Sequence, residues 1–113
     1  MLKSKIFREY DIRGVADEDL RSPDVEVLGK AIGTYFEQRG AKTVNLGRDC
    51  RLSSGWLRDA LVRGLVSTGR RVIDIGTAPT PLLYYSVFQS KAEGAVMITG
   101  SHNPSEYNGF KVM

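Results

Sequence analysis

The chain has 113 residues, 42% of them hydrophobic and 26% charged, which is the composition of a single folded domain and excludes a disordered chain. Sixteen basic and thirteen acidic side chains leave a net charge of +3, too weak and too scattered for a nucleic-acid surface. Cys50 is the single cysteine, so no intrachain disulfide can form, and because no apolar stretch suits a signal peptide or a membrane span, we expect a cytoplasmic protein with no membrane partner.

The first quarter of the chain predicts one strand and one helix. Residues 5–14 predict a strand that leads into an acidic loop at residues 16–19. Ser22-Pro23 is typical of an N-cap followed by a proline in the first turn. Apolar residues then recur at helical spacing and predict a helix over about residues 23–39, closed by Gly40; they are Val25, Leu28, Ile32 and Phe36.

The next segment repeats this pattern of a strand and then a helix. Residues 42–47 predict a short strand, and residues 48–54 a polar loop in which Arg48, Asp49 and Arg51 hold one another by charge-assisted hydrogen bonds. Ser53 or Ser54 can cap the helix that follows. Leucines at steps of four mark that helix, and Gly69 is expected to end it in a left-handed conformation; they are Leu57, Leu61 and Leu65.

A third strand and helix follow. Residues 71–75 predict a strand, and residues 76–79 a turn that Thr77 and Pro79 help to shape. Thr80-Pro81 repeats the signature of a cap and a proline. The predicted helix ends near Ser90 and is expected to carry four large apolar or aromatic residues: Leu82, Leu83, Tyr85 and Phe88.

The end of the chain predicts two more strands. Residues 94–99 are almost wholly apolar, as expected of a central strand that is covered on both faces. Asn108-Gly109 predicts a tight hairpin turn into a last strand over residues 110–113.

Strand and helix alternate three times, which predicts an α/β domain, a three-layer αβα arrangement with a mostly parallel (mixed) sheet. Such sheets bind ligands at the carboxyl ends of their strands. The loops after Leu46, Ile75 and Thr99 are expected to lie there.

Ser101 directly follows the buried strand and a glycine, in the sequence TGSHNP. Gly100 allows a sharp turn or a close approach, and Pro104 restricts Asn103 and stiffens the loop. These residues suit a presented serine, but they suit an ordinary strand-ending turn equally well. The hydrolase signature G-x-S-x-G and the phosphate-binding loop G-x-x-x-x-G-K-[ST] are both absent, and His102 is badly placed as a base for its own neighbour.

Four segments, in order along the chain, carry a family resemblance. They are FREYDIRG (residues 7–14), GRDCRLSS (47–54), DIGTAPTPLLYY (74–85) and TGSHNPSEYNGFK (99–111). Together they resemble the N-terminal domain of the α-D-phosphohexomutases, the phosphoglucomutase and phosphomannomutase family. The resemblance spans nearly the whole chain.

The resemblance implies a role for particular residues. Ser101 would carry a phosphoryl group, pass it to a hexose monophosphate and recover another from the bisphosphate intermediate. Arg13 and Lys111 would lie against this phosphoserine, and Lys111 is the candidate general base. Tyr10 and His102 would contact the sugar phosphate or orient the loop, whereas Asn103 and Asn108 are assigned to loop structure.

The resemblance also implies partners outside the chain. A Mg²⁺ ion would bind the phosphate on Ser101 and three aspartates of a second domain, and glucose 1,6-bisphosphate or mannose 1,6-bisphosphate would be the intermediate and activator. We expect residues 1–113 to be the first domain of a multidomain phosphohexomutase, truncated at its C-terminal end, with the remaining domains of the same protein as partners. The alternative is a noncatalytic phosphate-binding or assembly module on the same scaffold.

Overall fold

The computed structural model describes residues 2, 6, 12–100 and 103–113, and it has the predicted α/β fold. In chain order the elements are β1 (Ile12–Val15), α1 (Ala16–Asp19), α2 (Ser22–Gln38), β2 (Thr43–Arg48), α3 (Ser54–Ser67), β3 (Arg71–Thr77), α4 (Thr80–Ser90), β4 (Gly94–Ile98) and β5 (Tyr107–Val112). No helix in the described ranges is long and apolar enough to cross a bilayer.

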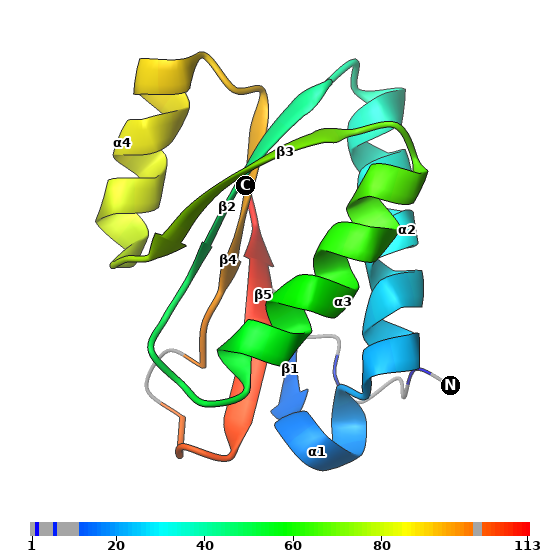
Figure 1. Cartoon of the computed structure of the whole chain (residues 1–113), viewed down its shortest axis with the longest axis vertical. Helices are drawn as coiled ribbons and strands as arrows, with labels where there is room; N and C mark the ends of the chain where they lie inside the picture. Colours follow the sequence, from blue (N-terminus) through cyan, green and yellow to red (C-terminus); the bar gives the residue numbers. More distant parts are fainter. Residues whose placement is uncertain (1, 3–5, 7–11, 101–102) are drawn as a thin grey trace.

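The five strands form one mixed sheet in the order β1-β5-β4-β2-β3. Strand β2 runs parallel to β3 and β4, whereas β5 runs antiparallel to β4 and β1. Helices α2 and α3 cover one face of this sheet and α4 lies on the other, so the domain has three layers (Figure 1). The parallel part is therefore the centre and one edge of the sheet, and only β5 runs opposite to the other four strands.

The main core lies between the sheet and the α2/α3 layer. Its side chains are fully or nearly fully buried and come from both helices and from the strands beneath them; examples are Leu61, Phe36 and Phe110. The two helices cross where Gly29 and Gly64 meet: a Cβ atom on Gly64 would overlap the carbonyl oxygen of Glu26 and lie 2.7 Å from the Cα of Gly29. Small residues at this crossing let the two backbones approach closely.

The α4 face of the sheet has a much smaller core. Leu83, Ala95 and Met97 form its buried cluster. The predicted helix is confirmed and carries the four large apolar or aromatic residues, of which only Leu83 is buried, while Tyr85 and Phe88 are 57% and 84% exposed. Helix α4 contacts β2 and β4 along a narrow strip of its surface.

The prediction for Asn108-Gly109 was also wrong. Both residues lie inside β5, where Asn108 pairs with Gly14 and Gly109 pairs with Arg13. The chain turns earlier, where the Tyr107 amide donates to the Pro104 carbonyl at 2.9 Å. Glycine at position 109 allows β5 to lie close to β1 and does not form a turn, since a Cβ there would overlap the Ile12 carbonyl oxygen.

Several element boundaries differ slightly from the predictions. Arg21 and Pro79, rather than Ser22 and Thr80, hold the N-cap positions of α2 and α4. Residues 16–19 form the short helix α1 instead of a loop, and the Asp19 carboxylate accepts the Val15 amide at its start. The predicted start of the first strand, residues 5–11, lies largely outside the described residues.

The predicted ends of α2 and α3 are confirmed, since Gly40 and Gly69 both have positive φ. Strand β3 extends two residues into the predicted turn and ends at Thr77. Its pairing with β2 is irregular at residues 75–76. There the Gly76 amide donates to the Asp74 carboxylate at 2.7 Å.

Candidate functional site

The loops that follow β2 and β4 lie side by side at one edge of the sheet. Because β2 and β4 are parallel neighbours with Arg48 opposite Ile98, both loops begin at the same level. The Asp49 amide donates to the Ile98 carbonyl at 2.9 Å and so extends the ladder into the loops. The prediction that these loops meet at the carboxyl ends of the strands is confirmed for their described residues.

Asp49 is the polar centre of this edge. One of its carboxylate oxygens, Oδ1, accepts the Ser54 hydroxyl at 2.6 Å and the Arg51 amide at 3.1 Å. The other, Oδ2, accepts the Gly100 amide and the Arg51 Nε, both at 3.1 Å. Each oxygen therefore accepts at least two hydrogen bonds, so the carboxylate is well satisfied.

This environment favours the charged form of Asp49. Partial burial acts to raise the pKa of the carboxyl group, but the hydrogen bonds from the Ser54 hydroxyl, the Arg51 amide and the Gly100 amide outweigh it and hold the pKa below its ordinary value. Asp49 is consequently ionised at neutral pH and does not serve as a proton donor.

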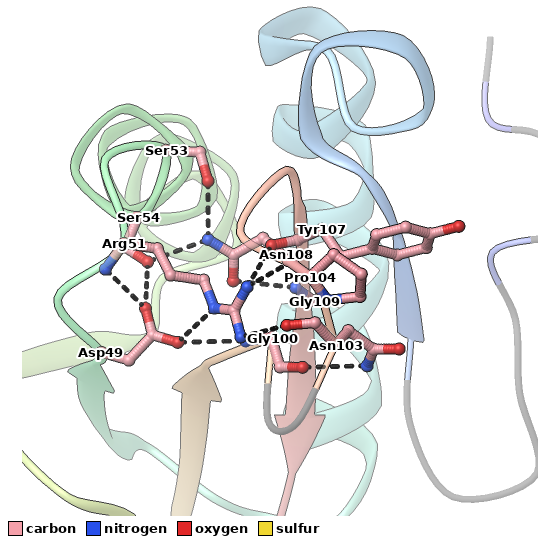
Figure 2. Close-up of polar contacts among 10 residues, drawn as sticks. All are labelled: Asp49, Arg51, Ser53, Ser54, Gly100, Asn103, Pro104, Tyr107, Asn108 and Gly109. Carbon is pink, nitrogen blue, oxygen red and sulfur yellow. Dashed lines mark hydrogen bonds and ion pairs between the residues drawn. The ribbon is translucent and has the colours of Figure 1, made fainter.

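Arg51 spans the two loops (Figure 2). Its Nη1 atom donates to the Pro104 carbonyl at 2.6 Å and to the Tyr107 carbonyl at 3.2 Å, and its Nη2 atom donates to the Asn103 carbonyl at 2.9 Å. Its Nε atom forms the ion pair with Asp49. The predicted interaction between Asp49 and Arg51 is confirmed, but Arg51 also holds the later loop, which the sequence did not indicate.

Arg48 does not join this group. Its guanidinium lies 3.5 Å from the carboxylate of Asp74 on β3, and the Arg58 Nε atom lies 2.7 Å from the same carboxylate. The prediction that Arg48 helps to hold the polar loop over residues 48–54 was wrong, because its side chain points toward the edge strand β3.

The two loops approach each other closely at Gly100. A Cβ atom here would overlap the guanidinium carbon of Arg51 and lie 2.7 Å from its Nη1 atom. The group that lies close to Gly100 is thus an arginine of this chain, whereas the prediction was a sharp turn or a close approach to a ligand.

Of the two asparagines assigned to loop structure, Asn103 has that role, whereas Asn108 lies within β5. The Asn103 side-chain amide donates to the Gly100 carbonyl at 2.9 Å. The buried Asn108 donates to the hydroxyls of Ser53 and Ser54 at 2.8 and 2.9 Å, and thereby ties β5 to the start of α3 (Figure 2). Neither serine makes the predicted N-cap hydrogen bond to α3.

Arg13 and Lys111 lie on the same face of the sheet, on the adjacent strands β1 and β5. Lys111 alternates along β5 with the core residue Phe110 and is paired with Met97, which faces α4, so its side chain faces the α4 side. Arg13 is paired with Gly109, two positions from Lys111 on the same strand, and faces the same side. This diagonal arrangement brings two long cationic side chains within reach of one another.

The remaining predicted site residues, Ser101, His102 and Tyr10, lie outside the described residues. A hollow of about 460 Å³ opens between the two loops and is lined by Asp49, Cys50, Arg51, Thr99, Asn103 and Ser105. It has the size of a small-molecule site.

The described ranges contain no group of three or more His, Cys, Asp or Glu side chains that could hold a metal ion. The acidic residues 16–19 do not form one, and Asp49 already accepts hydrogen bonds on both of its carboxylate oxygens. The residues present thus do not make a magnesium site by themselves.

Sequence reasoning missed the contacts of Arg51 with residues 103–107. Its partners lie more than 50 positions along the chain, so spacing could not reveal them. The available signal was the pairing of β2 with β4, since adjacent parallel strands place the loops after them side by side.

Comparisons with known proteins agree with this arrangement. The family described as phosphoglucomutase/phosphomannomutase, alpha/beta/alpha domain I, matches residues 4–113. A phosphomannomutase/phosphoglucomutase of Pseudomonas putida is 46% identical over 112 residues, which are 99% of this chain and 24% of that protein. A phosphoglucomutase/phosphomannomutase of Thermococcus kodakarensis is 42% identical over 111 residues, 96% of this chain and 24% of that protein.

A solved structure of a phosphoglucomutase/phosphomannomutase family protein from Burkholderia thailandensis superposes with a TM-score of 0.92 and 38% identity, covering 99% of this chain and 26% of that one. The chain thus spans about a quarter of the length of these relatives. The match over residues 4–113, the identity and the shared fold all show that the chain belongs to the phosphoglucomutase/phosphomannomutase family, as its N-terminal alpha/beta/alpha domain I.

Proposed function

We propose that this chain is the phosphoryl-carrying domain of a longer phosphomannomutase/phosphoglucomutase, which interconverts hexose 1-phosphates and 6-phosphates. In this proposal Ser101 stores the phosphoryl group between turnovers. The names of the relatives support the reaction class and the hexose substrates. The observation that carries the proposal is the pair of cations, Arg13 and Lys111, which share the sheet face beside the end of β4.

The charges near this edge suit a phosphoserine. A phosphoserine carries a charge of about −1.5 to −2 at neutral pH, and phosphoryl transfer is catalysed chiefly by positioning and by positive charge around the moving group. Arg13 would pair with the phosphate oxygens, for which its planar guanidinium is suited. Lys111 lies one row further along β5 and would face the attacking hydroxyl.

The proposed transfer has two halves. In the first, a sugar hydroxyl attacks the phosphorus of phospho-Ser101; a new P–O bond to the sugar forms and the P–O bond to the serine breaks. Lys111 gives a proton to the serine oxygen that leaves and recovers the proton of the attacking hydroxyl, so that it ends the step as it began. In the second half the same steps run in reverse with the other phosphate of the bisphosphate, and Ser101 is phosphorylated again.

The proposal also includes Tyr10 and His102 as groups that bind the sugar phosphate, and a Mg²⁺ ion that neutralises charge on the phosphoserine. In this proposal the other ligands of the ion come from the remaining domains of a longer protein. The bisphosphate sugar and the remaining domains are its expected partners, and the cytoplasm is its expected location.

Removing the hydroxyl of Ser101 tests the proposal. Ser101→Ala in the full-length protein should reduce the conversion of glucose 1-phosphate and mannose 1-phosphate to background, while hexose phosphate still binds. Ser67→Ala is the matched control, because Ser67 lies at the exposed end of α3, and it should keep full activity. An active Ser101→Ala enzyme would refute the proposal, and binding without any activity in the unaltered protein would identify a noncatalytic module instead.

A further inference from the structure

We propose that Arg51, oriented by Asp49, is the positioning residue of the loop over residues 99–107, and that this one side chain sets where the loop presents Ser101. The effect of Arg51 on catalysis rests on the proposed function, whereas its effect on the position of the loop does not. Arg51 is not itself a ligand of the phosphate in this inference.

The contacts of Arg51 are directed at the loop backbone. Its guanidinium donates to the carbonyls of Asn103, Pro104 and Tyr107. Carbonyls at three different positions fix both the height and the tilt of the loop over the sheet. A planar fork with five donors can satisfy such a set, whereas a lysine ammonium would reach only part of it.

Asp49, which directly follows β2, connects the Arg51 guanidinium to the sheet. It orients the guanidinium through Arg51 Nε and at the same time accepts the amide of Gly100. Two described residues of the loop are therefore held in place: Gly100 by Asp49 and Asn103 by Arg51. Displacing either contact would let the loop shift relative to Arg13 and Lys111, which are fixed on strands.

Gly100 shows that the fit is close. A Cβ atom at this position would overlap the guanidinium carbon of Arg51, so even alanine would force the arginine or the loop to move. The side chain of Arg51 is also largely enclosed, with 15% of its surface exposed. A solvated arginine that merely adds positive charge would tolerate that methyl group.

Two substitutions in the full-length protein disturb the same contact from opposite sides. Arg51→Lys keeps the positive charge but removes the planar guanidinium group, and Gly100→Ala keeps the guanidinium group but displaces it. For each we expect kcat to fall by about 10- to 100-fold and KM for the hexose phosphate to change less than about threefold, since a misplacement of about 1 Å costs rates of this order. The double variant should be no worse than the poorer single variant, because both changes remove one interaction.

The control is Arg63→Lys. Arg63 lies on α3 and, like Arg51, forms an ion pair, but its partner is the carboxylate of Glu26 and its side chain is 55% exposed. It should leave kcat and KM unchanged.

Hydrogen exchange measured by mass spectrometry gives a readout that does not need activity. The amides of Gly100, Asn103 and Tyr107 are hydrogen-bonded in the loop and should exchange at least about tenfold faster in Arg51→Lys, while peptides from α2 stay protected. If exchange in the loop rises but Ser101→Ala remains active, the proposed function fails and the positioning role stands.

The inference is overturned if Arg51→Lys leaves both kcat and loop exchange unchanged. It is also overturned if the loss appears in KM alone, because that would make Arg51 a binding group for substrate rather than a positioning residue.

Discussion

The two faces of the sheet are stabilised in different ways. The α2/α3 face is closed by a large apolar cluster and by two helices in contact at glycines. The α4 face has a cluster of three buried residues and carries Arg13 and Lys111 on its other strands. The difference suggests that one face stabilises the domain, while the other leaves polar side chains available for chemistry.

The edge between these faces uses a third kind of stabilisation. Asp49, Arg51 and Asn108 hold the loops by directed hydrogen bonds, most of which join residues far apart in the chain (Figure 2). Apolar packing tolerates changes of similar shape, whereas such a network depends on the identity of each group. Substitutions should therefore affect mainly stability on the α2/α3 face and mainly the loop at this edge.

The largest difference between the two faces should appear on shortening a buried leucine. Leu61 and Leu83 are both fully buried, but Leu61 lies in the large cluster and Leu83 in the small one. Leu61→Ala should lower the free energy of unfolding by about 4 kcal/mol and Leu83→Ala by about 2 kcal/mol, because a site near the surface can collapse onto the cavity. Urea unfolding measures both, and equal losses would contradict the comparison.

The helix crossing provides the next test. Gly64→Ala should cost about 2 to 3 kcal/mol, since the added methyl group overlaps the backbone of α2. Gly55→Ala lies on the same helix with nothing within 4 Å of its Cβ, so it should leave stability unchanged or raise it by less than about 1 kcal/mol. Similar values for the two variants would show that the helices do not meet at Gly64.

The polar edge should respond to pH. Since the folded pKa of Asp49 is lowered, its stabilising effect is present at neutral pH and is lost as the pH falls through that folded value, below the ordinary 3.8. Asp49→Asn should cost about 1 to 2 kcal/mol near neutral pH, and the difference from the unaltered protein should shrink in strong acid. A difference that does not depend on pH would contradict the hydrogen bonding described for Asp49.

The smallest effect is expected on the outer side of α4. Phe88 is 84% exposed, so Phe88→Ser should change the free energy of unfolding by less than about 0.5 kcal/mol. Asp59→Asn, which removes one partner of an exposed ion pair, should be equally mild. A large loss in Phe88→Ser would show that α4 is packed more deeply than the structure indicates.

Local patterns predicted the elements well. Leucines at steps of four marked α3, and the apolar run at residues 94–98 marked the buried β4, because each signal depends only on neighbours along the chain. The turn predicted at Asn108-Gly109 was wrong because pairing with β1 overrode the turn preference, and the exposure of Phe88 shows that helical spacing does not reveal how much of a helix is buried.

The candidate site was predicted less completely. The sequence placed Arg13 and Lys111 in it by resemblance, but the contacts of Arg51 depend on the strand order, which no local pattern encodes. The reversal of β5 against β4 and β1 likewise had to come from the fold.

The most direct test of the central claim is to follow a labelled phosphoryl group. The full-length protein is incubated with glucose 1,6-bisphosphate that carries labelled phosphates, digested, and mapped by mass spectrometry. The account predicts that label appears on Ser101 and leaves it again when unlabelled hexose monophosphate is added. Label on another residue, or an active enzyme that never labels Ser101, would contradict it.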